Sequence, residues 1–468
     1  MSRRLAGIAL VLALTGCAPV GPDYQQPALE TPARWTKDTE ARQQTPDLAQ
    51  TAWWRAFNDP LLNSLINQAI AANLELEQAR ARIAQARAGV VQAGAPGLPQ
   101  VNTAGVVRRS KSSDNVAAAG SGQTSTLYQA GFDAGWEIDV FGGVRRSVES
   151  AQARLEASIE DLHGVTLTLL GDVARNYIDL RASQAQLQIT RSNLAAQEDA
   201  VSLTKERYRL GLTSYLDVTQ AEALRTATES DLPPLEAAIK ASMHRLAILL
   251  ARPPSALDAE LSPPRPLPMV AGLLAAGMPA DLLARRPDLR AAERQLAAAS
   301  ADIGVATADL YPRFDLTLGL GLQANNSSSF VERASRYWSI VPGVALPLYD
   351  GGRRRATIAA KQGVYDETLA GYRAAYNTAL EDVENALTAY YAERDRNRIL
   401  TESVRVSEEA LALALDRYRR GLTTFLDVLT AQRALYTAQS NLTESNSRQL
   451  TDLIALYKAL GGGWQYQG

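Results

Sequence analysis

Apolar and polar residues alternate with a period of two in four short segments of the chain. The clearest segment runs from Tyr128 to Val140, and a second runs from Phe314 to Leu322. The alternation is less strict from Trp338 to Leu348 and weakest from Val101 to Arg109. Because side chains alternate between the two faces of a strand, this pattern predicts strands. The expected strands lie at about 100–110, 127–141, 313–323 and 336–348.

Alternation of this length, with Trp and Tyr near the ends of the segments, is typical of transmembrane β-barrels. A sheet that packs one face on a soluble core gives the same pattern. The alternation alone therefore favours neither arrangement.

A period of seven marks two much longer segments. No proline occurs from Val144 to Tyr208, and apolar residues recur every seventh position from Val173 onward. The second segment keeps the same period from Val383 to Tyr418, with Asn397 as an exception. This period predicts long helices that supercoil against other helices, each roughly 100 Å long at 1.5 Å per residue. A long helical bundle without a pore would show the same period.

Each long helix is expected to turn back at a Gly-Leu-Thr sequence. Gly211 and Gly421 suit the left-handed residue that ends a helix. The pairs Thr213-Ser214 and Thr423-Thr424 offer N-caps for the returning helices. Pro233-Pro234 predicts a kink or a restart in the first returning helix.

The two halves of the chain follow the same plan. Residues 207–218 and 417–428 are identical at nine of twelve positions, at an offset of 210. Gly142-Gly143 and Gly351-Gly352 each precede an arginine-rich segment. Matches in the same order indicate a duplication, which predicts a pseudo-symmetric pair of repeats. The expected organisation is a signal peptide 1–16, a lipidated extended segment 17–60, a first repeat 61–251, a proline-rich connector 252–278, a second repeat 279–461 and a tail 462–468.

Composition and charge exclude several classes of protein. The chain of 468 residues has a net charge of −2, which argues against a basic nucleic-acid surface, and we expect no nucleic-acid partner. One Cys and two His exclude a disulfide framework and a Cys/His zinc cluster. Aromatic residues make up only 6%, a composition typical of long helices.

The only cysteine lies at the end of the N-terminal apolar run. Basic residues are followed by Leu5 to Leu14, a run too short to span a bilayer, so it is read as a signal peptide. The run ends in Leu14-Thr15-Gly16-Cys17, which resembles a bacterial lipobox, and Cys17 is therefore the expected lipidation site. Because Ala18 is not Asp, the sorting pattern resembles that of outer-membrane lipoproteins.

Four strands cannot close on themselves. They leave two open edges, and open edges are not tolerated in lipid. Small closed barrels have about eight strands or more, so several copies of the chain would have to share one barrel. The sequence thus predicts an oligomer, and three copies would supply twelve strands, but nothing in the strand pattern selects that number.

The chain resembles outer-membrane efflux factors of the TolC/OprM type, in their lipidated NodT-like branch. The resemblance includes residues 16–24, 53–60, 285–294 and both Arg-Tyr-Arg-x-Gly-Leu-Thr tips. It implies a mainly helical homotrimer, with an α-barrel of duplicated hairpins in the periplasm and a shared twelve-stranded barrel in the outer membrane. The implied partners are a periplasmic membrane-fusion adaptor, an inner-membrane pump of the RND class and outer-membrane lipid.

In that family the hairpin tips close the channel and dock the adaptor. The docking positions map onto Gly211, Leu212, Thr213, Gly421, Leu422 and Thr423. The gate positions map onto Asp217, Tyr418, Leu426, Asp427, Thr430 and Arg433. Some members carry a carboxylate where this chain has Thr430, and an Arg where it has Thr423. We therefore expect a hydrogen bond from Tyr418 to Asp217 to be the remaining link between neighbouring hairpins. In the alternative interpretation, Asp217 and Asp427 only stabilise the first turns of their helices through the helix dipole.

No catalytic constellation is found, and neither an enzyme nor a cofactor is expected. His163 and His244 have no nucleophile or paired carboxylate at a recognisable spacing, so we expect each to be either a solvated or a helix-face histidine. Two other functions remain open at this point. The chain could be the exit duct of an ABC-type or type I exporter, or a lipid-anchored periplasmic coiled-coil scaffold without a pore.

Overall fold

The computed structural model describes residues 19–36, 52–115, 122–268, 270 and 285–465. The predicted signal peptide and Cys17 lie outside these residues. The chain divides into two compact units, and each is described by itself. The strand unit comprises Met1–Ala28, Ala81–Ile159 and Ala291–Arg373, and the tip unit comprises Leu29–Arg80, Glu160–Arg290 and Ala374–Gly468.

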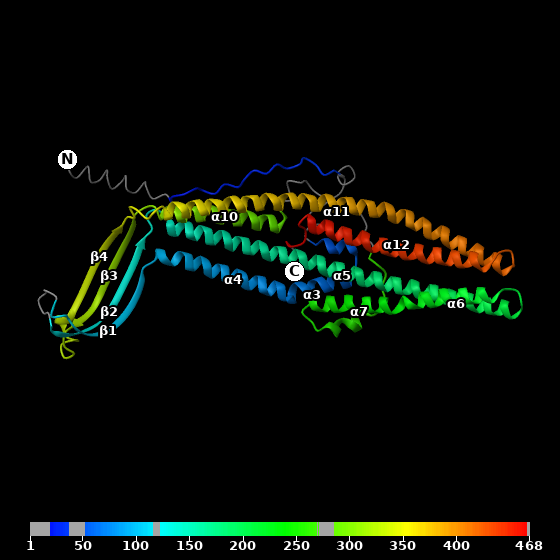
Figure 1. Cartoon of the computed structure of the whole chain (residues 1–468), viewed down its shortest axis with the longest axis horizontal. Helices are drawn as coiled ribbons and strands as arrows, with labels where there is room; N and C mark the ends of the chain where they lie inside the picture. Colours follow the sequence, from blue (N-terminus) through cyan, green and yellow to red (C-terminus); the bar gives the residue numbers. More distant parts are fainter. Residues whose placement is uncertain (1–18, 37–51, 116–121, 269, 271–284, 466–468) are drawn as a thin grey trace. The chain divides into compact units, whose positions relative to one another are not determined.

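Helices dominate the chain, and the second half repeats the order of the first (Figure 1). The elements of the first half are η2 (Trp53–Phe57), α3 (Pro60–Ala72), α4 (Leu74–Gly94), η3 (Ala95–Gly97), β1 (Gln100–Lys111), β2 (Thr124–Ile138), α5 (Gly143–Arg209), α6 (Tyr215–Ser230) and α7 (Leu232–Leu249). They are followed by η4 (Pro254–Leu257), α8 (Asp258–Leu261), α10 (Pro287–Ala308), β3 (Arg313–Ala324), η6 (Arg333–Ser335), β4 (Arg336–Ala345), α11 (Arg353–Arg419) and α12 (Phe425–Ala459).

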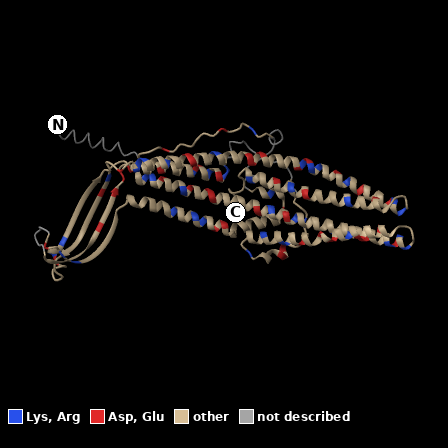
Figure 2. Ribbon diagram, in the orientation of Figure 1, with Lys and Arg blue, Asp and Glu red and all other residues tan. Residues whose placement is uncertain are grey.

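The strand unit contains an antiparallel sheet of four strands in the order β1-β2-β3-β4. This sheet confirms the four strands expected from the alternation. The strands are 10 to 15 residues long, enough to cross the hydrocarbon layer of a membrane when tilted. Figure 2 shows few charged residues on the strands and many along the helices. Among the described residues, none of the helices combines the length and hydropathy that a membrane span requires.

One face of the sheet is mostly apolar, and its polar members include Thr103, Arg109, Thr126 and Arg336. Phe132 lies opposite Leu320, and Leu320 lies opposite Trp338 on the next strand. All three side chains are exposed within one chain. The same face carries Val101, Val107, Ala130, Ala134, Trp136, Phe314, Leu316, Leu318, Ile340 and Val344. A continuous apolar face that the chain itself leaves uncovered is what contact with lipid requires.

The opposite face of the sheet is rich in glycine, and Tyr337 covers part of it. A Cβ atom at Gly321 would lie 2.9 Å from the Tyr337 ring, and one at Gly131 would lie 2.8 Å from its hydroxyl. The Tyr337 hydroxyl accepts a hydrogen bond of 3.1 Å from Gln129 Nε2. These glycines therefore leave room for a tyrosine that lies across neighbouring strands.

The break between β2 and α5 explains why the strand ends at Ile138 and not near the expected 141. Asp139 turns away from the sheet, and its carboxylate accepts hydrogen bonds from the backbone N–H groups of Val144 and Arg145. Gly142 follows with φ of 78°. A carboxylate at the start of a helix satisfies unpaired N–H groups and interacts favourably with the helix dipole.

The segment that follows the predicted lipidation site is held by a buried arginine of α5. Arg146 donates hydrogen bonds to the Val20 carbonyl at 3.1 Å and to Asp23 at 2.7 Å. Tyr24 donates a 2.6 Å hydrogen bond to Glu293 of α10. Burial and this carboxylate raise the pKa of Tyr24. Tyr24 and Glu293, which come from two of the segments that carry the family resemblance, therefore meet within the strand unit.

Residues 53–60 are a third segment that carries the family resemblance. Their aromatic side chains belong to the largest apolar core of the described part of the tip unit. Trp53, Trp54 and Phe57 are buried in a core shared with α3, α5, α7 and α12. Asp59 caps the N-terminus of α3 by accepting from the Leu61 and Leu62 amides, and Tyr177 of α5 donates to the same carboxylate. Burial, followed by this hydrogen bond, raises the pKa of Tyr177 to about 12. These residues join the short helices to the first long helix.

His163 lies on a face of α5, which is one of the two environments expected from the sequence, and its side chain is packed against other residues. Its ring stacks on Trp464 at 4.2 Å, and its Nδ1 lies 3.0 Å from Glu160. Arg290 lies over the same indole at 5.2 Å and pairs with Glu160 at 2.6 Å. The role of His163 is therefore to hold the C-terminal segment against α5, which only the tertiary structure reveals.

Candidate functional site

The two hairpin tips have the same backbone structure. In the first tip, Gly211 has φ of 71°, and the Leu212 N–H bonds to the Arg207 carbonyl at 2.8 Å. In the second tip, Gly421 has φ of 75°, and the Leu422 N–H bonds to the Arg417 carbonyl at 2.9 Å. This is the Schellman arrangement, which ends a helix with a left-handed glycine. The repeated sequence thus produces the same turn twice.

A threonine and an aspartate are hydrogen-bonded in each tip. The Thr213 hydroxyl donates to the Asp217 carboxylate, and the Thr423 hydroxyl donates to Asp427. Ser214 and Thr424 occupy the N-cap positions, but neither side chain makes a capping hydrogen bond. The expected side-chain caps are therefore replaced by bonds that tie the turn to the first turn of the returning helix.

The leucines of both tips are exposed within the chain. Leu212 and Leu216 project from the first tip, and Leu422 and Leu426 project from the second. Exposed apolar side chains that gather at one place mark a surface that other molecules cover. The docking residues expected from the resemblance therefore lie on an accessible surface.

The remaining gate residues follow one face of α12. Leu426, Thr430 and Arg433 are spaced at i, i+4 and i+7, and all three are exposed. The Thr430 hydroxyl donates to the Leu426 carbonyl at 2.8 Å. Within the part of the chain that the structure describes, Arg433 makes no ion pair, so its charge is available to another molecule.

The expected hydrogen bond between Tyr418 and Asp217 is not formed. The Tyr418 hydroxyl is buried and makes no hydrogen bond with the described residues, and the Asp217 carboxylate accepts from Thr213. The Tyr418 ring instead lies under the Arg207 guanidinium at 4.8 Å and meets the Phe425 ring at 5.5 Å. A cation–π contact therefore stands where the sequence predicted a hydrogen bond.

The two tips differ in the burial of their aromatic pair. Tyr418 and Phe425 of the second tip are 3% and 1% exposed, packed in a cluster with Val201, Ala221 and other residues of α5, α6, α11 and α12. Their counterparts at the offset of 210, Tyr208 and Tyr215, are 48% and 59% exposed. We call the contact between the two hairpins of one chain the internal seam. The internal seam covers one aromatic pair and leaves the other uncovered.

Polar contacts extend the internal seam away from the tips. Tyr436 of α12 donates to Asp231 at 3.0 Å and lies 3.2 Å from the Thr190 hydroxyl of α5. Asn193 donates to Gln439 at 2.9 Å. These contacts hold hairpin against hairpin along several helical turns.

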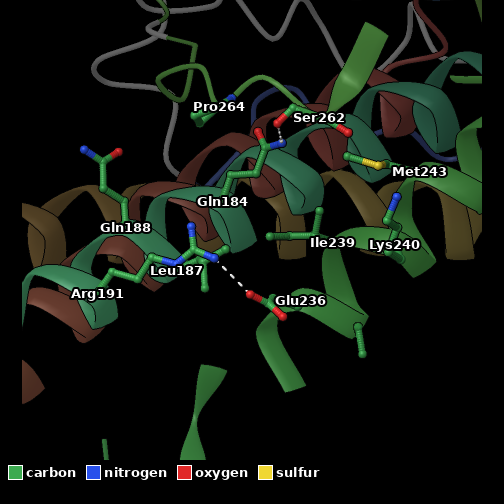
Figure 3. A pocket seen from close by; sticks show the side chains of 11 residues that line it. Gln184, Leu187, Gln188, Arg191, Glu236, Ile239, Lys240, Met243, Ser262 and Pro264 are labelled. Atoms are coloured by element: carbon green, nitrogen blue, oxygen red, sulfur yellow. Dashed lines mark hydrogen bonds and ion pairs between the residues drawn. The ribbon is translucent and has the colours of Figure 1, made fainter. Parts of the chain in front are cut away.

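The tip unit also contains a cavity of about 680 Å³ between α5, α7 and the segment after α8. Figure 3 shows Arg191 and Glu236 pointing toward each other across it, at 2.9 Å. The second cation of the lining, Lys240, pairs with Asp258 at 2.7 Å. The lining contains no nucleophile placed beside a base, so the cavity offers no catalytic arrangement. Among the described residues, no group of three or more His, Cys, Asp or Glu could hold a metal ion.

The sequence matches the family described as "Outer membrane efflux protein" over residues 65–252 and 278–462. The chain belongs to this family. It is 34% identical to Nodulation protein T of Rhizobium leguminosarum bv. viciae over 99% of this chain and 94% of that protein. It is 36% identical to the pyoverdine export outer membrane protein OpmQ of Pseudomonas putida over 99% of this chain and 98% of that protein.

Solved structures of outer-membrane channels have the same fold. The outer-membrane channel OprN matches with a TM-score of 0.90 and 35% identity, over 96% of this chain and all of that one. CusC matches with a TM-score of 0.84 and 25% identity, over 95% of this chain and all of that one. The fold expected from the resemblance is thereby confirmed. The chain is an outer-membrane efflux channel of a tripartite pump and not an enzyme.

One feature of the site escaped the sequence reasoning. The position of Arg207 over Tyr418 joins the two repeats, and the tip sequences do not reveal it by themselves. The repeat at an offset of 210 is the sequence feature that points to these residues, because it makes Arg207 equivalent to Arg417 and Tyr208 equivalent to Tyr418. Such a signal identifies equivalent residues, but it does not show which of them meet.

Proposed function

We propose that three copies of this chain form the exit duct of an efflux pump, with a periplasmic adaptor docked on the hairpin tips. The observation that supports the trimer best is the open sheet with its uncovered apolar face. Strands β1 and β4 each have one edge without a partner among the described residues, and an open edge in lipid leaves backbone groups without hydrogen bonds. Three such sheets supply the twelve strands that close a barrel.

The tips are the proposed docking surface for the adaptor. Leu212 and Leu422 are exposed at the two turns, and each turn is held by a Schellman motif and a Thr–Asp hydrogen bond. A rigid turn that presents an exposed leucine suits insertion into a groove of another helical protein. The pump itself would be an inner-membrane transporter of the RND class, as the resemblance implies.

The proposed gate lies at the hairpin tips and includes an aspartate from each of them. Asp217 and Asp427 recur in every copy, so a trimer presents six carboxylates at the periplasmic mouth. A ring of carboxylates favours cations. The cargo would be small organic molecules, a class that includes the pyoverdine and toluene named for relatives of this chain.

Mass and ion conductance test the channel. We expect the detergent-extracted protein to have about three times the mass of one chain, and to conduct ions in planar bilayers. The double variant Asp217→Asn with Asp427→Asn should reduce the preference for cations, whereas the matched control Asp395→Asn on α11 should leave it unchanged. A monomeric protein without conductance would contradict the channel and support a scaffold.

Photocrosslinking in intact cells tests the docking surface. A benzophenone amino acid placed at Leu212 or Leu422 should capture a periplasmic protein that Ile248, an equally apolar exposed residue of α7, does not capture. Capture of the same protein from all three positions, or from Ile248 alone, would contradict docking at the tips.

A further inference from the structure

The internal seam shows how the two hairpins contact each other within one chain, and the same contact can be compared with surfaces that face other copies. Within one chain, Arg207 of the first hairpin lies over the Tyr418 ring, and its Nη1 donates to the Arg419 carbonyl at 3.4 Å. Tyr418 and Phe425 belong to a buried cluster that includes Ala200 and Ala221, and Leu203 packs against this cluster. The second hairpin thus contributes an aromatic pair, and the first hairpin contributes an arginine and an apolar acceptor face.

The first hairpin carries a second aromatic pair that has no such acceptor in the chain. Tyr208 and Tyr215 lie at the positions equivalent to Tyr418 and Phe425, and their rings are 5.4 Å apart. Both remain about half exposed or more. Two neighbouring tyrosines exposed on one tip are characteristic of a surface that another molecule buries.

The second hairpin carries an unused acceptor face with the same residue at three equivalent positions. At the offset of 210, Ala200 corresponds to Ala410, Leu203 to Leu413 and Arg207 to Arg417. Ala410 and Arg417 are exposed, and Leu413 is 59% exposed. Arg417 makes no ion pair or ring contact with the described residues, unlike Arg207. An unused pair and an unused acceptor are therefore present on opposite hairpins of every chain.

We infer that the seam between copies repeats the internal seam at the tips: Tyr208 and Tyr215 of one copy pack on Ala410 and Leu413 of the next copy, under its Arg417. The occupant is a second copy of this chain because the chain already contains both halves of the contact in matching form. Such a contact is head-to-tail, and head-to-tail contacts form a ring when the rotation from copy to copy closes, as it does in the proposed trimer. The inference rests on the proposed trimer and specifies which surfaces meet.

The repeated part of the seam is limited to the tips. The counterpart of Tyr436, which bonds across the internal seam, is Thr226, whose side chain cannot span the same distance. The aromatic pairs and arginines are repeated, whereas this polar contact is not. In the proposed trimer, the contacts at the tips would therefore have nearly sixfold symmetry. The contacts farther from the tips would have only threefold symmetry.

Paired cysteines test the inference. The only native cysteine is Cys17, so Tyr208→Cys combined with Arg417→Cys can be cross-linked with a short bismaleimide in the full-length protein. We expect covalent dimers and trimers on denaturing gels. The matched control pair, Arg207→Cys with Tyr418→Cys, lies within one chain and should give only cross-linked monomer. Mixing chains that carry Tyr208→Cys alone with chains that carry Arg417→Cys alone should again give dimers.

The outcomes separate this inference from the proposed function. A protein with the mass of a trimer and channel conductance, but without cross-links between Tyr208→Cys and Arg417→Cys, would overturn the inference and leave the channel intact. A protein that is monomeric and does not conduct would overturn both. As a second measurement, Tyr208→Ala with Tyr215→Ala should weaken association of the copies by about tenfold or more, without loss of helix content in the single chain.

Discussion

The two hairpin tips are nearly identical in sequence and in backbone, yet their surroundings differ. Both end a long helix with a left-handed glycine, and both bond a threonine to an aspartate in the next helix. The second tip buries Tyr418 and Phe425, whereas the first leaves Tyr208 and Tyr215 exposed. Local sequence therefore determines the turn, and the neighbouring hairpin determines which aromatic pair belongs to the core of the chain.

The largest effect is expected from removing the buried aromatic ring of the second tip. Phe425→Ala should lower the free energy of unfolding by about 3–5 kcal/mol, because the side chain is packed on all sides and its loss leaves a cavity. Its counterpart Tyr215→Ala is the matched control and should cost less than about 1 kcal/mol. Urea unfolding of the dissociated chain, followed by circular dichroism, measures both values. Equal losses would show that the two tips do not differ in burial.

Substituting the two tip glycines should have similar effects in both tips. Gly211→Ala and Gly421→Ala should each cost about 1–2 kcal/mol, because both residues have positive φ. A Cβ atom would meet nothing within 4 Å at Gly211, and at Gly421 would only touch Arg207 at 4.0 Å, so the cost comes from the backbone. The same unfolding measurement applies, with asparagine at each position as the milder control. A loss at only one tip would show that the turns are not equivalent.

The two arginines are expected to differ within one chain. Arg207→Leu should lower the free energy of unfolding by about 0.5–1 kcal/mol, because it removes the cation above the Tyr418 ring. Arg417→Leu should leave the dissociated chain unchanged, because Arg417 has no ring contact among the described residues. The double variant Arg207→Leu with Tyr418→Leu should reveal the coupling energy of the pair. Additive losses would contradict the contact.

The smallest effect concerns pH. Burial, with the nearby Asp217 carboxylate adding to it, raises the pKa of Tyr418, while Arg207 and Thr213 oppose the shift. Because the pKa is higher in the folded chain than in the unfolded one, the folded chain holds this proton more tightly. Its contribution to stability is complete below pH of about 10 and declines as pH rises above that value.

Ultraviolet titration tests this pH dependence. The difference between the parent protein and Tyr418→Phe should show a phenol that ionises above the ordinary range of tyrosine. Stability measured between neutral pH and alkaline pH should fall less in Tyr418→Phe than in the parent. A Tyr418 that titrates as an ordinary tyrosine would contradict its burial.

Several features could be read from the sequence because they depend on neighbouring residues. The alternation of apolar residues predicted four strands, and the register places Phe132, Leu320 and Trp338 on one face as the alternation requires. The exception to the seven-residue period is also explained: Asn397 bonds to Ser445 and Asn446 of α12 and so takes the place of an apolar contact. The strand ends could not be placed as well, because Asp139 caps α5 and shortens β2.

The contacts between repeats could not be predicted from the sequence. The chain contains Arg207 and Arg417 in equivalent positions, but only the packing of α5 and α6 against α11 and α12 brings Arg207 over Tyr418 and leaves Arg417 free. The expected Tyr418–Asp217 bond was wrong, because packing between the hairpins buries the Tyr418 hydroxyl without a hydrogen-bond partner among the described residues.

By itself, the sequence determined the duplication, the strands, the long helices and the two turns, because each depends on residues close together in the chain. The tertiary structure decided which of two matching surfaces is covered, because burial depends on what a distant segment packs against. Tyr208 and Tyr418 show the difference: one motif occurs twice, and the hairpins of a single chain cover it once.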